Sequence, residues 1–338
     1  VNLLPTPIAS SGNFYELAKE YLLGGQEREP DIAPSIPVID ADLFRRLPEE
    51  STVIWFGHST VFLEIDGVRL LTDPIFSARC SPVQWAGPKR FFDTPISVDQ
   101  LPFIDYVLIS HDHYDHLDEQ TIRALAAKTK FFLVPLGVGA HLEIWGVAPD
   151  QIVELDWWQE YKINSEDVLA FTPSRHFSGR RLTDRNKTLW GSWVIHLGGK
   201  RFYFSGDTGY FPGFAEIGER YGPFDAVFLE VGAFHPSWAT VHLGTQNAVK
   251  AMELLKSNAL FPVHWGTFNL ALHGWTEPIE ELLALQKQHR FKLYYPAPGQ
   301  RIVMDDVPKG DFWWRTEQLA IHSRLELLPT DGNLAARE

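Results

Sequence analysis

Three histidines and their neighbouring aspartates lie within six residues of this chain, in the stretch His111–His116 (HDHYDH). Imidazole nitrogens and carboxylate oxygens form the ligand set of zinc and similar divalent ions. The stretch directly follows Tyr106–Ser110, whose apolar run is typical of a buried strand. Because α/β folds place ligand sites where a strand ends in a loop, the sequence predicts a metal site at this position.

Three more side chains of metal-ligand type follow apolar runs later in the chain: His176, Asp207 and His264. A single histidine of this kind is more often a hydrogen-bonded structural residue than a ligand. Four strand ends that share one chemistry are harder to explain separately, so we interpret them as parts of one site. The chain has one cysteine, Cys80, so the ligands must be nitrogen and oxygen atoms.

Short apolar runs and amphipathic segments predict the elements that position these residues. The runs with strand character are 52–56, 61–65, 68–72, 106–110, 131–134, 168–172, 190–196, 201–205, 226–230 and 260–263. Asp66-Gly67 predicts a hairpin, and Asp118, Thr245 and Thr276 each predict the start of a helix. Strands followed by strands, and then strands alternating with helices, predict two sheets with helices outside them.

Composition limits the classes of protein to which the chain can belong. Its 338 residues are 45% hydrophobic and 22% charged, as in ordinary globular proteins, and the formal charge of -13 argues against nucleic-acid binding. We expect an N-terminal extension over 1–50, a main domain over 51–307 and a C-terminal segment over 308–338. The single cysteine favours a cytoplasmic location, and no apolar run is long enough for a transmembrane helix. A chain that begins with Val leaves open an exported or membrane-peripheral form from which a leader was removed.

The stretch His111–His116 matches the HxHxDH signature of the metallo-β-lactamase superfamily, and His176, Asp207 and His264 follow in that superfamily's order. Longer blocks resemble the branch that contains N-acylphosphatidylethanolamine-hydrolysing phospholipase D and its bacterial relatives. These blocks are 55–60, 72–74, 87–91, 110–118 and 263–268. The resemblance covers roughly residues 50–300 and implies an αββα sandwich, in which two mixed sheets are flanked by helices.

The same resemblance implies a site for two zinc ions. His111, His113 and His176 would hold the first ion. Asp115, His116 and His264 would hold the second, and Asp207 would bridge the two together with a water or hydroxide. Iron or manganese suits the same nitrogen and oxygen ligands.

Three side chains are candidates for a catalytic role: Asp73, Asp115 and His242. The resemblance implies that Asp73 orients a ligand imidazole or the bound water, and a loop-capping role is an equal alternative. His242 matches a histidine of the phospholipase branch that would donate a proton to the leaving oxygen or hold a phosphoryl oxygen. A backbone-bonded structural histidine is the alternative, and Val241 departs from the glutamine that the phospholipases have there.

Basic residues gather around His176 in a chain that is otherwise acidic: Arg175, Arg180, Arg181, Arg185 and Lys187, with Lys89 and Arg90 in an earlier loop. We interpret them as a basic rim that attracts an anionic substrate, with an ordinary solvated loop as the alternative. The apolar segment 75–85 is expected to pack beneath its loop or to face an acyl chain or membrane. Residues 14–23 predict a helical patch, Asp112 is expected to point to solvent, and His58 is either near the site or structural.

These observations predict a zinc-dependent hydrolase that cleaves a phosphodiester, and the resemblance points to an N-acyl phospholipid. The alternatives within the fold are a lactonase, a nuclease and a β-lactamase, and the alternative outside it is a metal-binding regulatory protein without turnover. The expected partner is an anionic small-molecule or lipid substrate rather than a nucleic acid, with peripheral membrane contact left open. The sequence does not predict an oligomeric state.

Overall fold

Two seven-stranded sheets form the centre of the computed structural model, which describes residues 19–20, 23–306 and 312–315. The strands of the first sheet, in spatial order, are β14 (Arg301–Val303), β1 (Thr52–Trp55), β2 (Val61–Ile65), β3 (Val68–Thr72), β4 (Ile104–Leu108), β5 (Thr129–Pro135) and β6 (Ile152–Leu155). Those of the second are β13 (Lys292–Leu293), β12 (Ala259–Val263), β11 (Ala226–Glu230), β10 (Lys200–Phe204), β9 (Ser192–Leu197), β8 (Val168–Thr172) and β7 (Glu160–Lys162).

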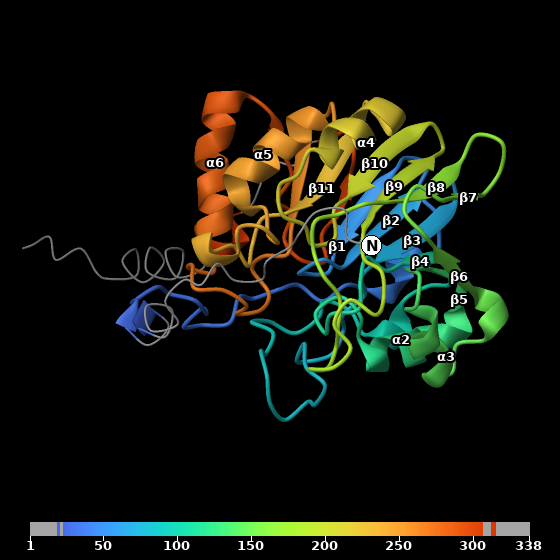
Figure 1. Ribbon diagram of the computed structural model, residues 1–338, viewed down its shortest axis with the longest axis horizontal. Coiled ribbons are helices and arrows are strands. Elements are labelled where there is room, and N and C mark those ends of the chain that lie inside the picture. Colours follow the sequence, from blue (N-terminus) through green and yellow to red (C-terminus); the bar gives the residue numbers. More distant parts are fainter. Residues whose placement is uncertain (1–18, 21–22, 307–311, 316–338) are drawn as a thin grey trace, which may run out of the picture.

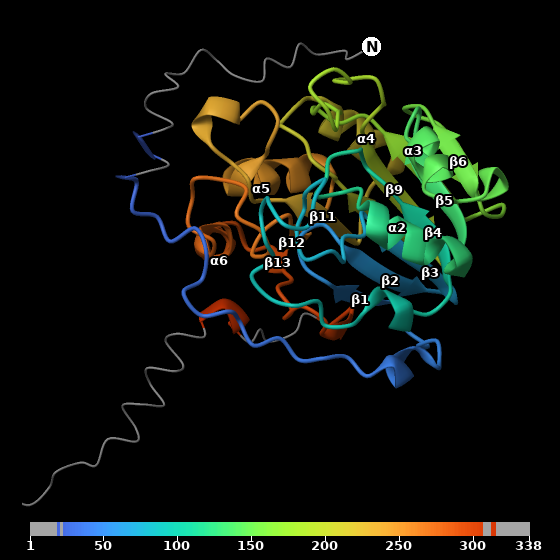
Figure 2. The same ribbon diagram turned by 90° about the horizontal axis from the view of Figure 1, so that it is seen from below.

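Helices cover the outer face of each sheet. The α-helices are α2 (Glu119–Leu125), α3 (Gly139–Ile144), α4 (Gly213–Tyr221), α5 (Gly244–Leu254) and α6 (Glu277–His289). Short 3₁₀ turns span Ala41–Phe44, Val98–Gln100, Ala126–Lys128, Pro149–Gln151, Pro236–Trp238 and Trp313–Arg315. Figures 1 and 2 show α2 and α3 on one side of the strands and α5 and α6 on the other, which confirms the expected αββα sandwich.

Side-chain alternation explains why the strands are buried on both faces. In β2, Val61 and Leu63 belong to the core between the two sheets, whereas Phe62 belongs to the cluster on the other face, which includes Ile122 of α2. All five residues of this strand are buried. Strands covered on both sides read as nearly continuous apolar runs, and this is why the sequence revealed them.

Parallel pairing directs the metal-ligand candidates to one edge of the sandwich. Strands β3 to β6 are parallel to one another, and so are β10 to β13. Asp73 and His111 follow two parallel neighbours of the first sheet, β3 and β4. Asp207 and His264 follow β10 and β12 of the second sheet. The carboxyl ends of these strands meet, as the strand-end reasoning predicted.

The structure tests the predicted hairpin and the predicted helix starts. The Asp66-Gly67 hairpin is confirmed, since Ile65 pairs with Val68 across it, and Asp118 caps α2 by accepting a hydrogen bond from the Gln120 amide. Thr276 directly precedes α6, so the predicted helix start is confirmed, but its side chain makes no capping hydrogen bond and its backbone is already helical. None of the helices among the described residues has both the length and the apolar character needed to cross a membrane.

The two chain ends are described in part. Most of the patch 14–23 lies outside the described residues. From Gly24 the N-terminal segment runs along the domain, where the Trp275 amide donates to the Glu27 carbonyl and the Ile39 amide to the Pro95 carbonyl. At the other end Trp313 and Trp314 are buried, and both rings lie against Trp265 at centroid distances of 5.4 and 5.6 Å.

Candidate metal centre

Three histidines form one half of the site, which we call the three-histidine group: His111, His113 and His176. His113 Nδ1 lies 2.9 Å from His111 Nε2 and 3.2 Å from His176 Nε2. Asp207 Oδ2 completes the group at 3.8 Å from His111 Nε2 and 3.6 Å from His176 Nε2. One ligand atom from each of the four side chains lies within 4.8 Å of the other three, which is close enough for the four to share a cation.

Two further histidines and a carboxylate form the other half, which we call the carboxylate group: Asp115, His116 and His264. Asp115 Oδ2 lies 3.2 Å from His264 Nε2 and 3.5 Å from His116 Nε2. Asp207 approaches this group with its other oxygen, since Oδ1 lies 3.1 Å from His116 Nε2 and 3.2 Å from His264 Nε2. The two oxygens of one carboxylate therefore face two different sets of ligands.

The chemistry of these atoms fits a pair of divalent ions. His116 Nε2 and Asp207 Oδ1 are buried and lie 3.1 Å apart, yet neither makes a hydrogen bond of good geometry within the described part of the chain. Buried polar atoms are nearly always satisfied, so unpaired atoms of ligand type indicate a partner such as a metal ion. Burial also lowers the pKa of His111 and of His176 well below the ordinary value, which keeps both imidazoles in the neutral form that metals bind.

Asp73 orients His116. Its Oδ2 accepts a hydrogen bond from His116 Nδ1 at 2.7 Å and another from the Ser110 hydroxyl at 2.6 Å, while Oδ1 accepts from the Ser110 amide at 2.7 Å. This contact fixes the ring so that Nε2 points toward Asp207. Of the two interpretations of Asp73, the geometry favours the orienting role over a loop cap.

His58 lies against the carboxylate group, although the sequence left its role open. Its Nε2 is 3.0 Å from Asp115 Oδ2, and its ring lies 4.1 Å from that of His264. The backbone of His58 is left-handed, with φ of 52°, and its carbonyl accepts hydrogen bonds from the His264 amide and from Trp55 Nε1. Burial lowers the pKa of His58 to about 3, so the neutral ring can hold Asp115 through its Nε2–H.

His242 reaches the centre from the loop before α5. Its Nδ1 lies 2.6 Å from Oε2 of Glu230, a fully buried carboxylate at the end of β11. Glu230 also accepts from the amides of Thr208 and Leu243. The His242 ring lies 5.3 Å from His176 of the three-histidine group and 5.5 Å from His264 of the carboxylate group. Sequence reasoning missed Glu230, because a carboxylate that ends an apolar strand looks like an ordinary strand boundary.

The prediction of a basic rim is wrong for two of its residues, Arg180 and Arg90. The Arg180 guanidinium turns inward and donates to the carbonyls of Asp112 and Leu117, both at 2.7 Å. Arg90 is buried and donates to the carbonyls of Ile75 and Phe56. These carbonyls hold both cations inside the protein, so neither is free to attract a substrate.

Asp112 is also corrected, because it is buried rather than directed to solvent. Its carboxylate accepts from the Gly179 amide at 2.7 Å and from the Thr188 hydroxyl at 2.8 Å. These bonds tie the loop after His176 to the HDHYDH stretch. Asp112 therefore has a structural role next to two metal-ligand candidates.

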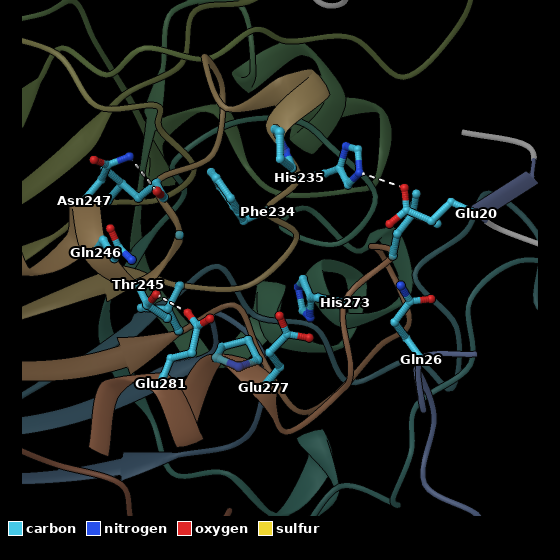
Figure 3. Close-up of a pocket in the computed structure, with 16 residues that line it drawn as sticks. Glu20, Gln26, Phe234, His235, Thr245, Gln246, Asn247, His273, Glu277 and Glu281 are labelled. Carbon is cyan, nitrogen blue, oxygen red and sulfur yellow. Dashed lines mark hydrogen bonds and ion pairs between the residues drawn. The ribbon is translucent and has the colours of Figure 1, made fainter. Parts of the chain in front are cut away.

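A cavity of about 490 Å³ lies beside the centre, between the loop after β11 and the first turns of α5 and α6 (Figure 3). Its acidic side chains already have partners. Glu281 accepts from the Thr245 hydroxyl at 2.5 Å, and Glu20 pairs with His235 Nε2 at 3.2 Å. Glu277 accepts from the Gly274 amide, as a carboxylate does at a helix start. None of the seven metal-ligand candidates lines this cavity.

Known proteins resemble both the sequence and the fold. A model of the beta-lactamase superfamily domain matches residues 68–265. An uncharacterised protein of Mycobacterium tuberculosis is 47% identical, over 84% of this chain and 77% of its own length. N-acyl-phosphatidylethanolamine-hydrolyzing phospholipase D 1 of Caenorhabditis elegans is 34% identical over 68% of each chain.

Among solved structures, isothiocyanate hydrolase from Delia radicum gut bacteria shares the fold with a TM-score of 0.60. It is 20% identical and the match covers 74% of this chain and 98% of that one. The chain therefore belongs to the metallo-β-lactamase superfamily. It is a metal-dependent hydrolase of this superfamily, and its clustered histidines and aspartates are candidate ligands for the metal.

Proposed function

We propose that this protein is a dinuclear zinc hydrolase that cleaves the phosphodiester of an N-acyl phospholipid. The observation that carries the proposal is Asp207, whose Oδ1 and Oδ2 face two different ligand groups. A carboxylate in this position would hold two cations at once. The name of the Caenorhabditis elegans relative supports the substrate class.

The chain supplies one set of ligands for each ion. His111, His113 and His176 would hold the first, Asp115, His116 and His264 the second, and Asp207 both. Zinc suits these ligands, and iron or manganese suits them as well. When bound, two such ions lower the pKa of a water molecule and stabilise the charge that develops on a phosphoryl group.

The pair of Glu230 and His242 supplies the proton for the leaving group. Burial alone would lower the pKa of His242, but the adjacent Glu230 carboxylate raises it above the ordinary value, which favours the protonated ring. Because Nδ1–H is bonded to Glu230, Nε2–H is the proton that can be donated. Hydrolysis of an N-acyl phosphatidylethanolamine would then give phosphatidic acid and an N-acylethanolamine, with one water consumed.

The direct test is to incubate the purified protein with N-acylphosphatidylethanolamine and, separately, with bis(p-nitrophenyl) phosphate, before and after treatment with a chelator. We expect release of the N-acylethanolamine, loss of turnover on chelation and recovery with zinc. Turnover that survives removal of every metal ion would exclude the metal-dependent mechanism. Chelator-sensitive cleavage of lactones or carboxylic esters, without cleavage of either phosphodiester, would favour the lactonase alternative.

A further inference from the structure

Three exposed apolar side chains line one surface cavity of about 560 Å³ or directly follow its lining residues in sequence. The loop before β4, the loop before α2, the helices α2 and α3, and Arg180 and Arg181 of the segment 177–189 form this cavity. Ile144 lines the cavity and is 76% exposed. Trp85, which is 82% exposed, and Leu182, which is fully exposed, directly follow lining residues of the two loops. Exposed apolar groups that gather in one place mark an interaction surface. In Figure 1 the cyan loop before β4 extends from the lower edge of the molecule.

Exposed cations accompany these side chains in the same two loops: Lys89, Arg181, Arg185 and Lys187. The ion pairs found among the described residues involve other cations. Three of the four basic residues of the segment 177–189 are exposed, against one acidic residue, in a chain with a net charge of -13. This local reversal of charge is complementary to an anionic partner.

The segment 177–189 is anchored at its base. The Asp112 carboxylate accepts from the Gly179 amide, and the inward-facing Arg180 guanidinium lies 4.0 Å from the Tyr114 ring centroid and 5.2 Å from that of Trp145. Since Arg180 is held inside, its neighbours Arg181 and Leu182 are left on the outside. The exposed tip is therefore built on a fixed support.

The same segment adjoins the metal centre. Phe177 packs against the rings of His113 and His176, at centroid distances of 4.6 and 4.7 Å. The exposed Arg185 guanidinium lies 5.3 Å from the Phe177 centroid on this side. A lipid held at this surface would lie beside the half-exposed His113 of the three-histidine group.

We infer that this surface docks onto an anionic lipid bilayer, and we call it the lipid-facing surface. It consists of three apolar and four basic residues: Trp85, Ile144, Leu182, Lys89, Arg181, Arg185 and Lys187. The apolar side chains would insert among the acyl chains, and the cations around them would contact the anionic headgroups. A nucleic acid would use the cations and leave the apolar tips in water. The inference rests on the proposed function for its choice of a lipid, and vesicle binding tests it without any turnover.

The test is flotation of the full chain with vesicles of phosphatidylcholine alone and with vesicles that also contain phosphatidylglycerol. We expect binding to the mixed vesicles, weakened at high salt because exposed charges are screened. The double variant Trp85→Ser and Leu182→Ser should lower the partition coefficient at least about tenfold, since both tips lose their apolar contact with the bilayer. Arg181→Glu with Lys187→Glu should abolish the preference for the anionic vesicles.

The matched control is Val38→Ser, because Val38 is 83% exposed but lies in the N-terminal segment. The control should bind as the parent does, and melting temperature and zinc content verify the folding of every variant. Ile144→Ser provides a second apolar test on a helix rather than a loop. Equal binding to both vesicles, binding to duplex DNA instead of vesicles, or an equal loss in the Val38→Ser control would each overturn the assignment. Because no hydrolysis is scored, this result is independent of whether the proposed activity is found.

Discussion

The two halves of the metal centre differ in how they hold protons. In the three-histidine group, burial lowers the pKa of His111, His113 and His176, so the rings are neutral. In the carboxylate group burial acts in the same sense on His116 and His264, but the nearby Asp207 and Asp115 overcome it. They raise the pKa of His116 well above the ordinary value and that of His264 to about 10.

This difference means that cation binding displaces protons from one half of the centre but not from the other. The three-histidine group offers lone pairs at neutral pH. In the carboxylate group the raised pKa values favour protonated imidazoles beside the carboxylates, and a cation must displace those protons. We therefore expect the first ion to bind over a broad pH range and the second to be the sensitive one.

Removal of the residue that the two halves share should have the largest effect. In Asp207→Ala both groups lose a ligand, and we expect fewer than two zinc ions per chain and a fall in kcat of about a thousand-fold or more, since metal catalysis contributes several kcal/mol. Elemental analysis and kinetics measure the two effects. Asp225→Asn, an exposed aspartate before β11, is the control. Retention of two ions by Asp207→Ala would refute the bridging role.

Loss of His242 should leave the difference between the halves intact while slowing turnover. Without its Nε2–H the leaving oxygen has no proton donor, and we expect kcat to fall about a hundredfold or more. Zinc content should remain that of the parent, because His242 is not among the proposed ligands. His289→Ala, an exposed histidine at the end of α6, should behave as the parent. Unchanged kinetics in His242→Ala would make His242 a structural residue.

Acidification should separate the two ions. The pKa values of His116 and His264 are raised, so each pH unit of acidification should weaken zinc binding at the carboxylate group by about tenfold for each proton displaced. The pKa values in the three-histidine group are lowered, so proton competition there begins only at much lower pH. Chelator competition, followed by zinc analysis from pH 8 downward, measures both affinities. Parallel loss of the two ions would contradict the comparison.

The smallest expected effect comes from His58, which contacts Asp115. In His58→Asn the Nε2–H contact to Asp115 Oδ2 is lost, and we expect affinity for the second ion to fall about tenfold, as is typical of residues that orient a ligand. Binding of the first ion should be unchanged. His196→Asn, a half-buried histidine bonded to the Tyr221 carbonyl, is the control. A loss that is equal at both ions would show a general disturbance instead.

The sequence revealed those parts of the molecule that depend on short-range pattern. The HDHYDH stretch is local, and the strands buried on both faces give continuous apolar runs, so the fold and the set of candidate ligands could be predicted together. Strands β6, β7, β13 and β14 were missed, because they are short and partly exposed at the ends of the sheets.

What the sequence could not reveal depends on contacts between distant segments. Glu230 has a role through His242, which lies twelve residues away and beyond a loop. Arg180 and Arg90 looked like surface charge, since nothing in their neighbourhood indicates that main-chain carbonyls receive them. Long basic side chains can bury their head group if oxygens await it, and only the folded chain shows whether they do.

The indole rings of Trp313 and Trp314 have a consequence at a distance. Both rings pack against Trp265, the residue that follows His264 in the chain. The backbone of His264 is left-handed, with φ of 63°. The C-terminal tryptophans thus support the left-handed turn at His264 from behind. Replacement of either indole by a small side chain should let that turn relax, and the relaxation would be visible in the spectrum of a cobalt-substituted protein although neither ring approaches a cation.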